Sequence, residues 1–228
     1  MRVMENRLYK LGTLALLPIP VLYVAPLWGI ILGDAHVTKF LPAKGTRGGK
    51  GKNSRLAFEY GAKNRVLAFS LYNILTTAGI KCSYPRLRHR LPDKRTGKVY
   101  GSYSFKASAS PYFTSLRKLF YVETKPHATK TIPKNIASVF TSWDLAWWIM
   151  DDGSWTGAGV DLNCHSFSLA DQGILCRMLK RNFGILAHSK VTSDQNKFVI
   201  YIPAAQIDKL RELVLPYMLS DYLYKLGL

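Results

Sequence analysis

Two aspartates in this 228-residue chain follow apolar segments, in a position that a helix disfavours. Asp34 comes directly after segment 26–33, and the pair Asp151 and Asp152 comes directly after segment 145–150. If both segments are helices, each acid lies at the end where the helix dipole is negative, and dry surroundings would raise its pKa further. A bound cation removes both penalties. One such acid is more simply interpreted as turned into solvent, but two in one chain favour a pair of metal ligands.

The segments around the two aspartates are expected to fold in the same order. In the first half, hydrophobic spacing and turn residues predict a motif helix at 26–33, strands at 36–40 and 55–60, a helix at 63–78 ending at Gly79, a hairpin with strands at 83–91 and 99–107, and a helix at 111–121. In the second half, the same signals predict a helix at 142–152 with Ser142 as its N-cap, a strand at 160–167, a helix at 168–183 ending at Gly184, a hairpin with strands at 185–193 and 197–202, and a helix at 204–215. We interpret segment 123–135 as a linker and the residues after Pro216 as a basic tail.

This repetition predicts a fold and a division into halves. The two aspartates are 152 − 34 = 118 residues apart, about the size of one small domain. We therefore expect an α/β (α+β) fold made of two tandem copies of one unit, related by a pseudo-twofold axis. The first half would comprise residues 1–125, including a Pro-rich N-terminal segment, and the second half residues 126–228.

The charge of the chain predicts an anionic partner. There are 32 Lys and Arg residues against 14 Asp and Glu, so the formal net charge is +18. These basic residues recur along the sequence and are interleaved with aromatic and β-branched residues, which indicates an ordered basic surface rather than a disordered arm. Duplex or structured nucleic acid is therefore favoured over a membrane surface or an acidic protein.

Several other interpretations are set aside. Segment 11–33 carries no charge and is long enough to span a bilayer, but three prolines interrupt it, so we expect no transmembrane segment and no cleaved signal. The three cysteines have no CxxC spacing and predict neither a disulfide framework nor zinc. The glycines of segment 47–52 lack the Gly-Lys-Ser/Thr ending of a P-loop. His165 has no partner at ligand spacing and is expected to make a polar strand contact.

The two helix-end segments carry a family resemblance. Residues 27–35, Leu-Trp-Gly-Ile-Ile-Leu-Gly-Asp-Ala, and 145–153, Leu-Ala-Trp-Trp-Ile-Met-Asp-Asp-Gly, look like two copies of the LAGLIDADG motif. The flanking segments KTIPKN, LNCHSFS, YIP and YLYKL resemble, in order and spacing, those of single-chain, intron-encoded LAGLIDADG homing endonucleases. The likeness runs from about Pro26 to the C-terminus. One such nonamer would be weak support, whereas two copies with these flanks are specific.

The resemblance implies an architecture and an activity. In that family the two motif helices pack side by side, the acids at the eighth motif position, here Asp34 and Asp152, project toward DNA, and antiparallel sheets form a DNA-binding saddle. The implied activity is that of a monomeric, site-specific endonuclease that makes metal-dependent double-strand breaks in a long, loosely palindromic target. Hydrolysis would leave 5′-phosphate and 3′-hydroxyl ends with short 3′ overhangs.

The chemistry fits carboxylate ligands. Cleavage of a phosphodiester needs an activated water, charge relief at phosphorus and help for the leaving oxygen, and metals held about 4 Å apart can serve all three. Mg²⁺ suits an all-oxygen site that leaves the ion several waters. We expect Mn²⁺ to substitute, and Ca²⁺ to support binding without efficient cleavage because its looser geometry positions water poorly.

The resemblance also assigns residues around the acids. Lys130, in KTIP, and Lys225, in YKL, match the family's basic residues near each scissile phosphate, although either alone would be interpreted as a solvated charge. Gly33 and Asp151 are expected to offer main-chain carbonyls to the metal. For Asp151, a supporting acid beside the metal and an outward-facing side chain remain open alternatives. Gly29 and Gly33 together give the first motif helix a GxxxG-like face that favours close packing.

Many basic residues of the predicted strands and loops are candidates for DNA contact. They are Lys44, Arg47, Lys50, Lys52, Arg55, Arg86, Arg88, Arg90, Lys94, Arg95, Lys98, Lys190 and Lys197. Most should touch phosphates, and any one of them could be a plain solvated charge. The alternating row Arg86, Arg88 and Arg90 is the best candidate for base readout, because Arg pairs bidentately with guanine.

Two other functions compete with cleavage. The first is an intron RNA maturase on the same fold, which would bind intron RNA and assist splicing. The second is a DNA-binding regulator, which would need neither the two aspartates nor the two lysines. The resemblance further implies an organellar intron product, in a mitochondrion or a chloroplast.

Overall fold

A computed structural model describes residues 25–39, 53–89, 91–124, 128–192 and 197–228, and every structural statement below concerns these residues. The first half consists of α3 (Leu27–Leu32), β1 (His36–Lys39), β2 (Ser54–Gly61), α4 (Arg65–Thr77), β3 (Arg86–His89), β4 (Gly101–Lys106) and α5 (Pro111–Phe120). The second half consists of α6 (Ser142–Asp152), β7 (Gly153–Trp155), β8 (Val160–Asn163), α7 (Leu169–Phe183), β9 (His188–Val191), β10 (Phe198–Ile202) and α8 (Ile207–Val214). The two halves therefore run through the same elements in the same order.

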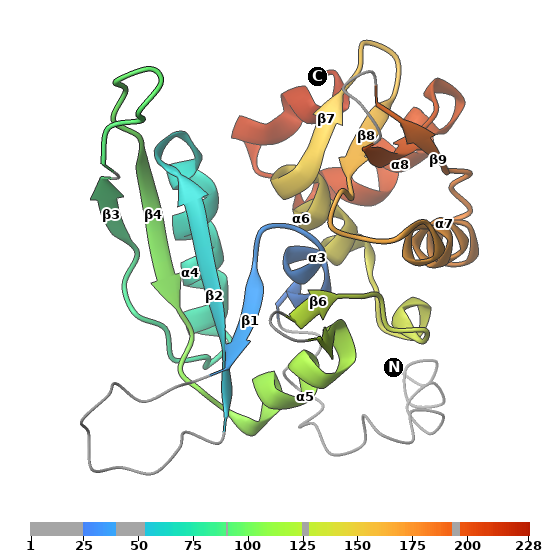
Figure 1. Cartoon of the computed structure of the whole chain (residues 1–228). Coiled ribbons are helices and arrows are strands. Elements are labelled where there is room, and N and C mark those ends of the chain that lie inside the picture. The colour runs from blue at the N-terminus through green and yellow to red at the C-terminus, as the bar shows by residue number, and fades with distance from the viewer. Residues whose placement is uncertain (1–24, 40–52, 90, 125–127, 193–196) are drawn as a thin grey trace, which may run out of the picture.

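Each half contains one four-stranded antiparallel sheet. The strand orders are β1-β2-β4-β3 and β7-β8-β10-β9, which correspond strand for strand. Figure 1 shows the two sheets on either side of the central helices α3 and α6. The predicted fold class, two tandem copies of one α/β unit with antiparallel sheets, is confirmed.

The alternation of side chains along the strands gives each sheet one core face and one open face. On β2, Leu56, Phe58 and Tyr60 are buried on the face that packs against helices α4 and α5. In the second sheet, Leu162 and Ile200 are paired across β8 and β10 and are both buried. On each strand, the residues that alternate with these buried ones point to the open face of the sheet.

The motif helices form the centre of the core. Every residue of α3 is buried, and on α6 the buried stretch runs from Asp144 to Met150. Trp28, Trp147 and Trp148 are among the largest fully buried side chains. A helix that is apolar on nearly all sides is stable only inside a core. The central position of the motif helices therefore explains why their sequences are almost continuously apolar.

Several local predictions were wrong. The N-cap of α6 is Thr141 rather than Ser142, because the Thr141 side chain accepts from Asp144 N. The interpretation of 123–135 as a plain linker was wrong, because strand β5 (Tyr121–Glu123) pairs with β6 (Ala128–Lys130) in a two-stranded antiparallel sheet. The predicted boundary between residues 125 and 126 lies outside the described residues and stays a prediction.

Three further corrections concern the second half. Strand β7 was not predicted, and strand β8 ends at Asn163 rather than at residue 167. The expected basic tail contains a 3-10 helix, η6 (Ser220–Leu226), in which Tyr222, Lys225 and Leu226 are buried. Within the described ranges, no helix is both long and apolar enough to cross a membrane.

Candidate active site at the ends of the motif helices

Helices α3 and α6 approach each other at the two glycines of α3. A Cβ atom built on Gly29 would lie 1.9 Å from the main-chain oxygen of Asp144, and one built on Gly33 would lie 2.1 Å from Asp151 Oδ2. A larger residue at Gly29 would collide with the main chain of α6, and one at Gly33 would displace the Asp151 side chain. The predicted glycine face of the first motif helix is therefore confirmed, and the second helix fills it with its own main chain and with a carboxylate.

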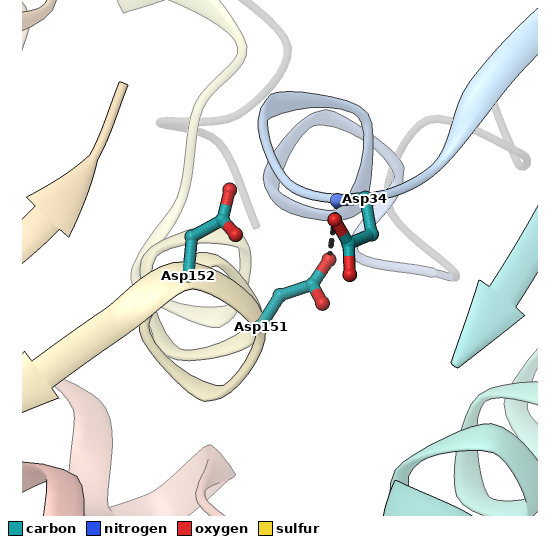
Figure 2. Close-up of side chains that lie close together, drawn as sticks. All are labelled: Asp34, Asp151 and Asp152. Carbon is teal, nitrogen blue, oxygen red and sulfur yellow. Dashed lines mark hydrogen bonds between the residues drawn. The ribbon is translucent and has the colours of Figure 1, made fainter. Parts of the chain in front are cut away.

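This close packing brings three acids together at the helix ends. Carboxylate oxygens of Asp34, Asp151 and Asp152 lie within 4.8 Å of one another. Figure 2 shows Asp34 on the α3 side, and Asp151 and Asp152 on the α6 side, with their side chains turned toward the space between the helices. Asp151 Oδ2 accepts a hydrogen bond from Asp34 N at 2.7 Å. The structure thus unites the two predicted aspartates and adds the carboxylate of Asp151.

Crowding and burial disfavour the ionised form of all three acids. Burial raises the pKa of Asp152 to about 7, and the neighbouring charge of Asp34 adds to this shift. Burial and the charges of Asp34 and Asp152 raise the pKa of Asp151 well above its ordinary value. Burial also raises the pKa of Asp34, against the opposing effect of Lys130 and Lys225. Carboxylate oxygens that repel one another suit a cation, so this donor set fits a divalent metal ion.

The two predicted lysines lie beside these acids, one at the end of each motif helix. Lys130 Nζ donates to Gly33 O at 3.0 Å and to Ala35 O at 3.3 Å. Lys225 Nζ donates to Met150 O at 2.6 Å and to Asp151 O at 3.1 Å. Each ammonium group therefore caps the C-terminal carbonyls of one motif helix, where a positive charge is favourable.

Burial lowers the pKa of both lysines. It lowers the pKa of Lys130 to about 8, and the charges of Asp152, Asp151 and Asp34 act in the opposite direction. Burial also lowers the pKa of Lys225, against the same three acids. The two carbonyls that we predicted as metal ligands, on Gly33 and Asp151, are the carbonyls that these lysines contact. Their role toward a metal stays a prediction.

Lys130 is held in place by a residue that the sequence did not single out. Asp171 Oδ1 accepts from Ile132 N and from Thr131 Oγ1, both at 3.0 Å, directly after Lys130 in the chain. Its other oxygen completes the capping box of α7 with Ser168. The Ser-x-x-Asp spacing predicts the capping box. No local signal predicts the contact that spans 40 residues.

The open face of the first sheet carries the predicted reading residues. Arg86 pairs with Ser104 and Arg88 with Ser102, so both side chains lie on the face opposite the buried Phe105. Both arginines are exposed. The prediction that this row faces one side of the strand is confirmed for Arg86 and Arg88, whereas Arg90 lies outside the described residues.

The other predicted DNA contacts have different surroundings. Arg55 is half-buried on β2, and Lys190 forms an ion pair with Asp161 at 2.8 Å and lies 4.0 Å from the centroid of the Tyr201 ring. Lys94, Arg95 and Lys98 are exposed at the turn between β3 and β4, and Lys197 is exposed directly before β10. Lys44, Arg47, Lys50 and Lys52 fall outside the described residues, as does the segment in which a P-loop was set aside.

His165 makes the polar strand contact expected of it. His165 Nδ1 contacts Phe198 O at 3.2 Å, which is a strand contact. The three cysteines are free thiols. Among the described residues, the only group of three or more His, Cys, Asp or Glu side chains that could hold a metal is the Asp34, Asp151 and Asp152 cluster.

A doubled α/β unit that joins two motif helices and places acids at their adjoining ends defines the class of this protein. The model of the LAGLIDADG DNA endonuclease family matches residues 25–210. The chain belongs to this family.

Relatives and solved structures agree with this assignment. Over 205 residues the chain is 29% identical to the cytochrome b mRNA maturase bI2 of Saccharomyces cerevisiae, covering 88% of this chain and 46% of that protein. The chain thus spans about half the length of that relative. It is 33% identical over 128 residues to a probable intron-encoded DNA endonuclease 3 of Mycosarcoma maydis, which covers 55% of this chain and 93% of that protein.

The homing endonuclease I-WcaI, solved bound to its DNA recognition sequence, is similar in three dimensions. The TM-score is 0.74 at 25% identity, covering 91% of this chain and 86% of that chain. The fold predicted from the doubled motif is therefore that of a solved homing endonuclease.

Proposed function

We propose that this chain is a site-specific homing endonuclease that makes metal-dependent double-strand breaks in DNA. The observation that carries the proposal is the cluster of three carboxylates within 4.8 Å, flanked by two lysine ammonium groups, in a chain of the LAGLIDADG family. The target would be long and loosely palindromic, because two similar but unequal halves would read it. The products would carry 5′-phosphates and 3′-hydroxyls with short 3′ overhangs.

The carboxylates of Asp34, Asp151 and Asp152 would hold the divalent ions, with Mg²⁺ as the expected metal and Mn²⁺ as a substitute. When bound, such ions acidify a water molecule and stabilise the charge that develops on phosphate oxygens. The chain's own residues orient the reacting groups. Lys130 and Lys225 would place positive charge beside the phosphates, one at the end of each motif helix, in positions set by the carbonyls they contact.

The open faces of the two sheets would bind the duplex. Arg86 and Arg88 project from the first sheet and are the expected readers of bases. In the second sheet, Lys190 is held by Asp161. DNA phosphates would compete with Asp161 for Lys190, so this residue contributes to phosphate contact at the cost of an existing ion pair.

A cleavage assay on a randomised duplex library tests the proposal. Incubation with Mg²⁺ should enrich one cleaved sequence with short 3′ overhangs, and EDTA should abolish its recovery. Ca²⁺ should allow retention of the same duplex on a filter with little cutting. Equal cleavage in EDTA would show that the carboxylate cluster is not a metal site.

A second function is favoured by one specific observation. A relative covering 88% of this chain is named as a cytochrome b mRNA maturase. On this alternative the chain binds intron RNA, and the organellar location expected from the family, in a mitochondrion or a chloroplast, would be the site of splicing. Splicing of the host intron in vitro, stimulated by an Asp34→Asn protein that cannot cut DNA, would establish the maturase role separately from cleavage.

A further inference from the structure

Helix α3 begins without a side-chain cap of its own. Pro26 occupies its N-cap position and makes no side-chain hydrogen bond. The first amides of a helix have no acceptor within the helix and need one from elsewhere. Trp28 N and Gly29 N donate instead to Asp144 Oδ1, at 3.0 Å and 3.1 Å. The acceptor for α3 therefore comes from the other half of the molecule.

The same carboxyl group also caps its own helix. Asp144 Oδ2 accepts from Thr141 N at 2.9 Å and from Thr141 Oγ1 at 2.6 Å, within the capping box of α6. Asp144 is buried, so its oxygens are shared between these two helices rather than with solvent. One side chain thus terminates both motif helices at their N-terminal ends.

A second contact joins the helices at their other ends. Asp151 Oδ2 accepts from Asp34 N, and Gly33 leaves the space that this carboxylate occupies. Gly29 similarly leaves the space for the main chain of Asp144. The two acids are 151 − 144 = 7 residues apart on α6, which is about two helical turns. Two contacts at this separation fix both the translation and the rotation of α3 relative to α6.

We propose that Asp144 is a positioning residue of the candidate metal centre. By holding the first amides of α3, it sets where Asp34 lies relative to Asp151 and Asp152. The position of Asp34 has little tolerance, because Mg²⁺ requires oxygen ligands at about 2.0–2.1 Å in near-ideal geometry. A shift of α3 by one residue would move its side chains by about 1.5 Å, which is too far for such a site. This inference rests on the proposed function only in assuming that the metal centre serves DNA cleavage.

Four variants separate the two roles of Asp144. Asp144→Ala removes the acceptor from both helices. Thr141→Ala removes only the hydroxyl of the α6 cap and leaves the bonds to α3. Ser110→Ala removes the unrelated cap of α5, in which the Ser110 side chain accepts from Phe113 N, and it serves as a control for the loss of a helix cap. Each protein is first shown to be folded at the temperature of measurement.

Asp144→Asn is the conservative variant. Its amide oxygen can accept from the two α3 amides, while its amide nitrogen faces Thr141 Oγ1, a hydroxyl that can turn to accept instead of donate. The opposite orientation would leave the amide nitrogen facing two N–H groups. We therefore expect Asp144→Asn to keep the α3 contact and to lose the bond from Thr141 N.

The readouts are the affinity for Mn²⁺ alone, from a titration followed by electron paramagnetic resonance, and the hydrogen exchange of single backbone amides. Asp144→Ala should weaken Mn²⁺ binding about 10- to 100-fold, as the loss of a residue that orients metal ligands does. It should also speed exchange at Trp28 and Gly29. Thr141→Ala and Ser110→Ala should leave both readouts unchanged, and Asp144→Asn should restore most of the affinity.

Across all variants, Mn²⁺ affinity must follow the protection of Trp28 and Gly29 and not that of Thr141. Equal losses in Asp144→Ala and Thr141→Ala would overturn the proposal, because Asp144 would then act only as the cap of α6. If Asp144→Ala does not fold, the Asp144→Asn protein decides: full Mn²⁺ affinity with unprotected Trp28 and Gly29 amides overturns the inference. A wild-type protein that binds no Mn²⁺ would instead overturn the proposed metal site, and the exchange data would still test the contact between the helices.

Discussion

Burial raises the pKa of Asp144 to about 6 and that of Asp152 to about 7, from ordinary values near 3.8. Between about pH 4 and pH 7 the folded state therefore retains protons that the unfolded state releases, so the free energy of unfolding falls as the pH rises. A bound cation should offset this loss, because it stabilises the ionised carboxylates. In EDTA we expect the melting temperature to decrease across this range. Excess Mg²⁺ should restore it above about pH 7 and have little effect near pH 5, where the acids hold their protons.

Asp152→Asn provides the control for this pH dependence. The variant lacks one of the acids with a raised pKa, so its melting temperature should depend less steeply on pH and should respond less to Mg²⁺. Differential scanning calorimetry of both proteins measures the effect. A wild-type melting temperature that increases with pH in EDTA between about pH 5 and pH 7 would contradict the assigned pKa shifts.

Asp34→Asn and Asp152→Asn should each nearly abolish the cutting of both strands while leaving DNA binding intact or tighter. The carboxylates repel one another and the DNA phosphates, so a neutral amide relieves this repulsion. It also removes a metal ligand, and if the acids share ions, both strands lose their chemistry together. A gel of supercoiled plasmid measures the outcome. Rapid accumulation of nicked circles with either variant would instead indicate two independent sites.

At the scale of elements, the contact of Asp171 with the residues after strand β6 leads to a prediction about Lys130. Lys130→Ala should slow cleavage in a single turnover with little change in DNA affinity, because the residue lies beside the acids and not on the open sheet faces. Asp171→Asn should reproduce part of this loss, since Asp171 holds the residues that follow Lys130. Ser110→Ala again serves as the control for the loss of a cap. If Lys130→Ala weakens binding alone, Lys130 is an ordinary phosphate contact.

The exposed position of Arg88 on the first sheet leads to a prediction about base readout. Arg88→Ala should relax base preference at one or two positions of the target, at a cost of about 1–3 kcal/mol for the preferred base. Lys118→Ala is the matched control, because Lys118 is exposed on α5 rather than on the open sheet face. Binding to a library of single-base target variants measures both proteins. A uniform loss of affinity with Arg88→Ala would show that Arg88 contacts phosphate.

The elements also show how far the sequence could predict the structure. Apolar periodicity and the glycines at positions 79 and 184 predicted the helices α4 and α7, because these signals act within a few residues. Strand β6 was missed because its three residues pair with β5 and have no distinct pattern of their own. The 3-10 helix around Lys225 looks like a charged tail in sequence, because its burial depends on contacts with α6 and β7, which lie far away along the chain.

The candidate site shows the same difference between local signals, which the sequence reveals, and contacts between distant residues, which it does not. Asp34 and Asp152 were predictable from their place at helix ends and from the repeated motif. The carboxylate contacts of Asp144 and Asp151 with α3 were not, because their partners lie 115 to 117 residues away. A helix-capping acid has the same sequence signal whether it serves one helix or two.

At the scale of the whole molecule, the net charge of +18 predicts strongly salt-dependent DNA binding. With about 6–10 phosphate contacts, affinity should fall by about 10³- to 10⁵-fold between low and moderate salt. The active species should be a monomer, because both halves of the site lie in one chain. Analytical ultracentrifugation of the complex with a cleavable duplex measures its stoichiometry. A complex that contains two chains per duplex would contradict this prediction.

The glycines of α3 and the carboxylates of α6 have an evolutionary consequence. With the two motifs aligned 118 residues apart, Pro26, Gly29 and Gly33 correspond to Asp144, Trp147 and Asp151. Two copies of α6 would bring buried acids against each other with a tryptophan in place of the glycine, and two copies of α3 would leave their first amides without an acceptor. The halves are therefore complementary rather than interchangeable. Whatever symmetric ancestor the repeat descends from, neither half can return to pairing with its own duplicate.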